Sequence, residues 1–126
     1  MGYKPFEEWI AQADYDMDTA QAMFEAGRYI YCIFMIHLSM EKTLKGLWSK
    51  NFKQDAPKTH DLIYLVNKLQ INPPEEIYNT ISEIDEVSVP TRYPEILKTL
   101  IQGYPKERTE NIFNKSKKVL GWLRIQ

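Results

Sequence analysis

Residues 30–48 read IYCIFMIHLSMEKTLKGLW, and this segment sets the architecture of the whole chain. Apolar side chains occupy every face of its first half, which a helix tolerates only where protein surrounds it. The uninterrupted apolar run is about ten residues, and a bilayer needs roughly 18 or more. The second half carries Glu41, Lys42 and Lys45, whose charges are costly to bury without partners. We therefore expect a central core helix over about residues 28–51 that ends in a group of charges.

The segment before it has the pattern of a helix with one apolar face. Apolar residues recur at three- and four-residue steps from Phe6 to Phe24, which is helical spacing. Acidic residues such as Asp14 and Asp18 fall on another face, where we expect solvent rather than a metal or partner site. Gly27 is placed to end this helix in a left-handed cap.

Two further helices are expected after a polar loop. Thr59 is placed to cap a third helix over about residues 60–70. Asn72, two prolines and Glu75 then predict an Asn cap and the first turn of a fourth helix, which should run to about Val87.

Proline and glycine interrupt the pattern between residues 88 and 104, so we expect an ordered loop there, with a helical turn near residues 96–101. A basic last helix should begin at Pro105 or Lys106. No segment alternates apolar and polar residues as a strand does, so the fold class is all-α. Short connections among the first four helices favour an up-and-down bundle of four to five helices.

The composition is that of one globular domain spanning residues 1–126, with 44% hydrophobic and 26% charged residues. The tryptophans and several tyrosines exceed what one small core holds, so a homodimer face or singly exposed aromatics must take up the excess. The opening MGYKPFEEW lacks a signal-peptide pattern, and lone Cys32 suits a reducing compartment. We expect a cytoplasmic protein without a membrane segment. The net charge of -1 argues against broad nonspecific nucleic-acid binding and leaves RNA open.

Most catalytic and metal motifs are missing. A helical-bundle metal site often uses Glu-x-x-His, but His37 follows Phe34 by three residues and His60 follows Pro57. We expect no metal, no cofactor and no catalytic residue. His37 is expected to be a hydrogen-bonded core histidine. The chain also lacks a glycine-rich phosphate loop, so phosphate recognition would require basic side chains or helix N-termini.

The candidates for such recognition are Lys45, His60, Arg92 and Tyr93, with Glu41 as a supporting ion-pair partner. Glu41 and Lys45 lie four residues apart on one helical face, where an exposed pair contributes about 0.3–0.5 kcal/mol. Arg92 is expected in a proline-flanked loop, where its guanidinium could hold a carboxylate or phosphate beside Tyr93.

These same elements resemble the HEPN family over nearly the whole chain. HLSMEKTLKGLW at residues 37–48 is similar to the family's charged central helix, PKTHDLIYL at 57–65 to its THDL element, and TRYPE at 91–95 to its RYP loop. The resemblance implies a helical bundle that dimerises. It further implies a nucleotidyltransferase partner of minimal size, a toxin–antitoxin setting and nucleotide binding.

Other HEPN proteins are metal-independent ribonucleases with an Arg-x4–6-His motif. In this chain both histidines precede Arg92, and Arg28 is too far from His37 to form the motif. Arginine can stabilise phosphate charge but cannot shuttle a proton near neutral pH, as histidine does. We therefore expect no ribonuclease activity by this mechanism.

Three hypotheses follow. The preferred one is a noncatalytic HEPN protein that dimerises, pairs with a minimal nucleotidyltransferase and binds nucleotide or phosphate. The second is a divergent ribonuclease in which His60 reaches Arg92 in space. The third is a purely structural helical dimer in which the charges set packing and register.

Overall fold

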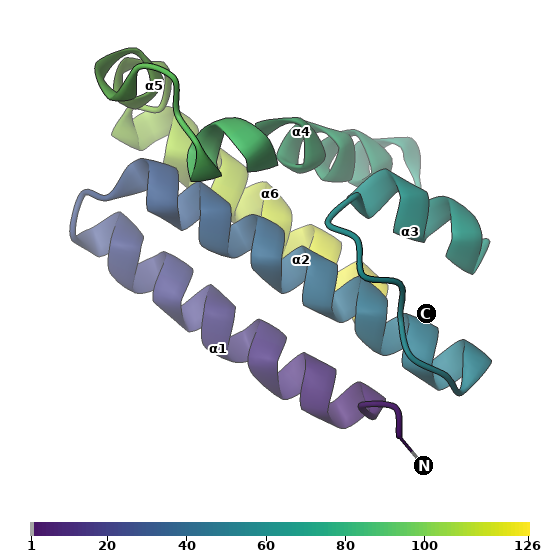
Figure 1. The fold of residues 1–126 in the computed structure, drawn as a ribbon. Helices are drawn as coiled ribbons and strands as arrows, with labels where there is room; N and C mark the ends of the chain where they lie inside the picture. The colour runs from purple at the N-terminus through teal and green to yellow at the C-terminus, as the bar shows by residue number, and fades with distance from the viewer. Residues whose placement is uncertain (1) are drawn as a thin grey trace.

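The computed structural model describes residues 2–126, which form six helices and no strand (Figure 1). The helices are α1 (Phe6–Glu25), α2 (Tyr29–Phe52), α3 (Leu62–Leu69), α4 (Glu75–Arg92), α5 (Leu97–Gly103) and α6 (Lys106–Arg124). The all-α class and the up-and-down bundle are confirmed. The expected count of four to five helices was too low, because residues 97–103 form a helix of their own.

Helix α2 is the central element, as its apolar sequence predicts. It packs against each of the other five helices. Its residues Ile33, Ile36, Met40, Leu44 and Leu47 are fully buried. Its buried core partners come from every other helix except α5 and include Ala20, Leu65, Ile84 and Leu123, and the partly buried Leu100 of α5 packs against this core.

Helices α1 and α2 form an antiparallel hairpin (Figure 1). Gly27 joins them at φ +75°, the left-handed conformation expected of it. A second glycine lets the helices approach closely: a Cβ at Gly46 would lie 3.0 Å from the Cβ of Trp9 and 3.3 Å from Phe6 Cδ1.

Two expected helix starts were wrong. Helix α3 begins after Asp61, whose side chain accepts a hydrogen bond from the Tyr64 amide at 2.9 Å, while Thr59 accepts from the Asp61 amide. Helix α4 begins after Pro74 rather than Asn72, without a side-chain cap. Glu75 and Glu76 in its first turn are the negative charges that a helix N-terminus favours.

The C-terminal half of α4 also differs from expectation. The helix passes through Pro90 and ends at Arg92, so Arg92 is helical and does not lie in a loop. Proline removes one amide donor, but Thr91 adds side-chain hydrogen bonds to Val87 O at 2.7 Å and Ser88 O at 3.2 Å. The Tyr93 amide continues the ladder to Val89 O at 2.9 Å.

Cys32 is fully buried, as expected for a small core residue, and burial raises the pKa of its thiol to about 12. Across residues 2–126, the helices lack the combination of length and hydrophobicity that crossing a membrane requires.

Candidate functional site

A group of charged side chains is buried in the second half of α2. Glu41 is 4% exposed and Lys45 is 8% exposed. Lys45 Nζ donates to Glu41 Oε2 at 3.0 Å, so the two residues form an ion pair within α2. His60 Nδ1, from the loop before α3, lies 2.9 Å from Glu41 Oε1. An ionised carboxylate can only accept, so His60 donates through Nδ1.

His37 and Asp85 extend this group toward α4. His37 is fully buried, with Nδ1 3.9 Å from Glu41 Oε1 and Nε2 3.7 Å from Asp85 Oδ1. Both separations exceed hydrogen-bond length, so the expected core position is confirmed but the expected hydrogen bond is not observed among the described residues. We name His37, Glu41, Lys45, His60 and Asp85 the Glu41 cluster.

Asp85 joins the cluster to the start of α3. Its carboxylate accepts hydrogen bonds from the amides of Leu62 at 2.9 Å and Ile63 at 3.4 Å. Burial alone would raise the pKa of Asp85, but His37 and these amides stabilise its charged form and the net shift is downward. Asp85 therefore caps α3 from a neighbouring helix, alongside Asp61.

Lys45 also lines a surface pocket of about 370 Å³, which we name the lysine pocket. Its other lining residues come from the N-terminal segment, α1 and the loop after α2: Gly2, Lys4, Trp9, Asp55, Ala56, Pro57 and Lys58. Lys4 Nζ lies 4.1 Å from the Trp9 ring centroid, a cation–π contact. The indole N–H of Trp9 donates to Ser49 Oγ at 3.2 Å, which fixes the ring.

The charge balance of the lysine pocket favours an anion. Three lysines, Lys4, Lys45 and Lys58, line the pocket together with one acidic residue, Asp55. Glu41 behind Lys45 neutralises one of these charges, and an excess of positive charge remains. Each lysine carries several N–H donors, so Lys45 can hold Glu41 and still donate to a ligand oxygen.

Arg92 and Tyr93 lie away from this pocket. The Arg92 guanidinium carbon is 4.8 Å from the Phe34 ring centroid. Lys45 comes eleven positions after Phe34 on α2, about 16 Å along the helix at its usual rise. Tyr93 is 76% exposed at the end of α4. The four candidates therefore do not gather in one site: Lys45 and His60 share Glu41, while Arg92 and Tyr93 lie toward the other end of α2.

Sequence reasoning did not select Lys4, Trp9, Lys58 or Asp85. Lys58 belongs to the PKTHDL element that carries the family resemblance, so that element could have pointed to it. Lys4 and Trp9 arrive through the α1–α2 hairpin, and no local spacing relates them to Lys45. Across residues 2–126, His, Cys, Asp and Glu side chains form no group of three that could hold a metal ion.

Fold and site together define a class: a small helical-bundle domain with an ion-paired central helix and a basic pocket at one end. The sequence model of the HEPN domain family matches residues 6–126, and the chain belongs to this family. Comparison with curated proteins found no match.

Two solved structures are similar along nearly their whole length. TT1696 from Thermus thermophilus is 23% identical, with a TM-score of 0.80 over 95% of this chain and 96% of that chain. ST0689, described as an archaeal HEPN homologue, is 26% identical, with a TM-score of 0.76 over 98% of both chains. The first likeness concerns the fold alone.

Proposed function

We propose that this protein is a noncatalytic HEPN protein that binds the phosphate of a nucleotide in the lysine pocket, forms a homodimer and pairs with a minimal nucleotidyltransferase. The observation that carries the binding proposal is the convergence of Lys4, Lys45 and Lys58 on one hollow beside Trp9. Family membership supports the proposed partner and the toxin–antitoxin setting. The buried thiol of Cys32 is compatible with the cytoplasm that we propose as its location.

The pocket has the parts that phosphate recognition needs. Its volume of about 370 Å³ is in the range of small-molecule sites. Glu41 holds Lys45 in place, so less side-chain entropy is lost when a phosphate binds. Lys4 now covers the Trp9 ring; if a phosphate draws Lys4 away, the ring face becomes free to stack on a base.

The proposal of a noncatalytic protein has a geometric basis. Acid–base cleavage of RNA needs a titratable group within hydrogen-bond reach of the reacting oxygens. His60 is held by Glu41, which lies two helical turns, about 10 Å along α2, from Phe34, the residue whose ring Arg92 contacts. His37 is fully buried and closed to substrate. The ribonuclease hypothesis therefore gains no support from the positions of the histidines.

Titration calorimetry with ATP, AMP and inorganic phosphate tests the binding proposal. The double variant Lys4→Gln/Lys58→Gln removes two pocket charges whose side chains are outside the core. We expect its affinity to fall about tenfold or more, a loss of at least about 1.4 kcal/mol. The matched control is Lys106→Gln/Lys118→Gln, two exposed lysines of α6. Equal affinity of the pocket variant and the control, or no binding of any anion at millimolar concentration, would refute phosphate binding here.

Co-expression with a minimal nucleotidyltransferase from the same genome tests the proposed pairing. We expect the two proteins to copurify and to remain together through gel filtration. Separate elution of both proteins at micromolar concentration would contradict the pairing and leave the phosphate proposal untouched.

A further inference from the structure

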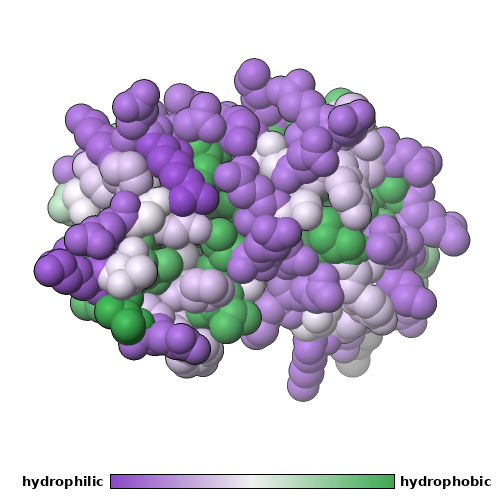
Figure 2. All heavy atoms as spheres, turned by 90° about the horizontal axis from the view of Figure 1, so that it is seen from above, coloured by the Kyte–Doolittle hydropathy of each residue, from purple (hydrophilic) through white to green (hydrophobic). Residues whose placement is uncertain are grey.

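Helix α5 is an apolar element without a buried residue. None of its seven residues is buried, and the large apolar side chains of Leu97 and Ile101 are each about half exposed. Of the eleven large hydrophobic side chains exposed on the described chain, six lie around this helix, and we name them the α5 face. They are Tyr31, Val89, Tyr93, Ile96, Leu97 and Ile101. Figure 2 looks down on the side that carries α4 and α5, and hydrophobic atoms break its polar surface in the left half, where α5 lies in Figure 1.

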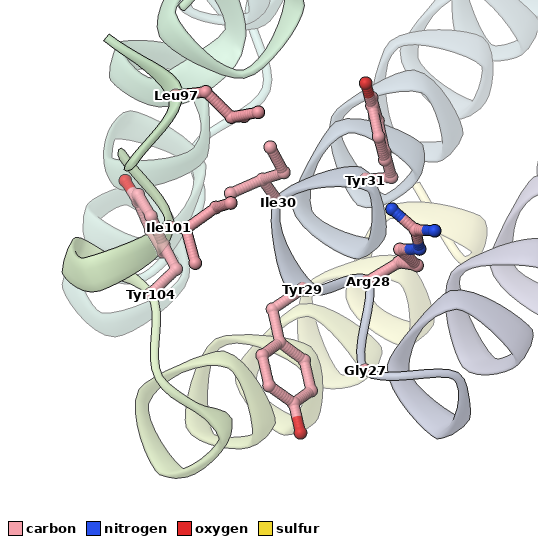
Figure 3. A pocket seen from close by; sticks show the side chains of 8 residues that line it. All are labelled: Gly27, Arg28, Tyr29, Ile30, Tyr31, Leu97, Ile101 and Tyr104. Carbon is pink, nitrogen blue, oxygen red and sulfur yellow. The ribbon is translucent and has the colours of Figure 1, made fainter. Parts of the chain in front are cut away.

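The α5 face contains a ridge and two hollows. One hollow, of about 290 Å³, lies between α5 and the start of α2 and is lined by Tyr31, Leu97 and Ile101. In Figure 3, Leu97 points from α5 toward Ile30 across this hollow. The other hollow, of about 370 Å³, lies between α5 and the end of α4. Helix α5 is thus a ridge with a hollow on each side.

This shape suits a second copy of the same chain. A twofold interface is self-complementary, so one patch must supply both the ridge and the hollow that receives it. The α5 face supplies both. Six side chains of this size, each between 47% and 76% exposed, present on the order of 600 Å² of mostly apolar surface. A standard interface buries about 800 Å² per partner, so this patch with its polar rim is of the size that a stable dimer needs.

The charges around the patch also permit self-association. Arg28 lines the first hollow, Glu95 lines the second, and Lys98 is exposed on α5. A twofold axis can place the Glu95 of one copy against a basic residue of the other. The net charge of -1 per chain generates little repulsion between two copies.

We propose that the α5 face is the surface through which two copies of this chain associate, with α5 of each copy seated in the hollow between α5 and α2 of the other. This inference rests on the proposed homodimer and names its surface. It assigns Tyr93 to the interface rather than to phosphate binding. Lys45 lies fourteen residues along α2 from Tyr31, about 21 Å, so both lysine pockets of the dimer stay open.

Sedimentation velocity on the full chain tests the surface. The wild type is expected to sediment with twice the chain mass of 14.9 kDa. Leu97→Glu and Ile101→Glu each place a charge on the α5 face without touching the core, and each variant is expected to sediment as a 14.9 kDa monomer with unchanged helical circular dichroism. The control Tyr15→Glu alters an exposed aromatic on α1 and should stay dimeric.

A cross-link gives a second readout that does not depend on weakening the dimer. Cys32 is fully buried, so a cysteine introduced at Lys98 is the accessible thiol of the described chain. A short bis-maleimide is expected to join two Lys98→Cys chains and to leave Ala11→Cys chains, altered on α1, as monomers.

The outcomes separate the two proposals. A dimeric wild type with dimeric Leu97→Glu and Ile101→Glu variants would overturn the α5 face and leave the homodimer standing. A monomeric wild type would overturn both. A monomer whose α5 face is needed only for copurification with the nucleotidyltransferase would assign the surface to that partner and overturn the proposal of a second copy.

Discussion

Replacing Glu41 with alanine should be among the most destabilising single changes in this protein. The carboxylate is the common partner of Lys45 and His60, and its side chain is only 6% exposed. Its removal leaves the Lys45 ammonium with 11% exposure and no partner, and breaking a buried pair costs about 3–5 kcal/mol. Lys45 borders the lysine pocket and can turn toward water, so we expect a value near 3 kcal/mol.

Urea denaturation at pH 7, followed by circular dichroism, measures this loss. For a domain of this size, a loss of 3 kcal/mol should lower the urea midpoint by about 1.5 M and the melting temperature by about 10 °C. The exposed residue Glu110 is the matched control, and Glu110→Ala should change stability by less than about 0.5 kcal/mol.

A double variant separates charge pairing from packing. Glu41→Leu/Lys45→Met removes both charges and keeps apolar volume, so it should recover most of the stability lost by Glu41→Ala. A loss below about 1 kcal/mol for Glu41→Ala would show that the pair behaves like an exposed one. A double variant as unstable as the single variant would show that charge burial is not the cause.

Three further predictions concern Asp85, two glycines and the ribonuclease hypothesis. Because the pKa of Asp85 in the folded protein lies below its ordinary 3.8, its stabilisation is complete above that value and is lost as pH falls through the lower folded pKa. Asp85→Asn should cost about 1–2 kcal/mol at pH 7, and its urea midpoint should fall less steeply than that of the wild type below pH 4. Gly46→Ala should cost about 1–2 kcal/mol through contact with Trp9 and Phe6, whereas Gly121→Ala, with open space around it, should stabilise α6 by about 0.5–1 kcal/mol in the same titration. In an RNA cleavage assay the wild type, His60→Ala and Arg92→Ala should all be inactive; cleavage by the wild type that either substitution abolishes would restore the ribonuclease hypothesis.

The helices could be predicted largely from local patterns, and their ends could not. The apolar run that leads to Met40 predicted a helix surrounded by protein, and Gly27 predicted a left-handed turn. The structure has both the buried helix and the turn. The start of α3 depends on Asp85, a residue 23 positions from Leu62 along the chain, and Thr59 was the wrong cap because Asp61 and Asp85 satisfy those amides. The fourth helix was expected to end near Val87, but α4 continues through Pro90 to Arg92, because proline removes only its own amide donor and the Thr91 hydroxyl adds hydrogen bonds to Val87 O and Ser88 O.

The candidate site was predictable only in part, for a similar reason. Glu41, Lys45 and His60 were recognised from helical spacing and the resemblance, and the structure brings them together. Arg92 was grouped with them by its chemistry and by the resemblance of TRYPE to the RYP loop, but neither gives its distance from Lys45; its contact with Phe34 reflects the antiparallel packing of α2 and α4. Lys4 and Trp9 complete the lysine pocket because the α1–α2 hairpin brings the N-terminus beside the end of α2 (Figure 1).

Nuclear magnetic resonance of the indole N–H groups tests most directly whether the lysine pocket binds phosphate. The Trp9 signal, assigned by its loss in a Trp9→Phe variant, reports on a ring that Lys4 covers and Ser49 holds. On titration with AMP, we predict a saturable shift of the Trp9 signal, an unchanged Trp122 signal on α6, and loss of the Trp9 shift in the Lys4→Gln/Lys58→Gln variant. A Trp9 signal that stays in place at saturating AMP, or one that shifts equally in that variant, would contradict phosphate binding by the lysine pocket.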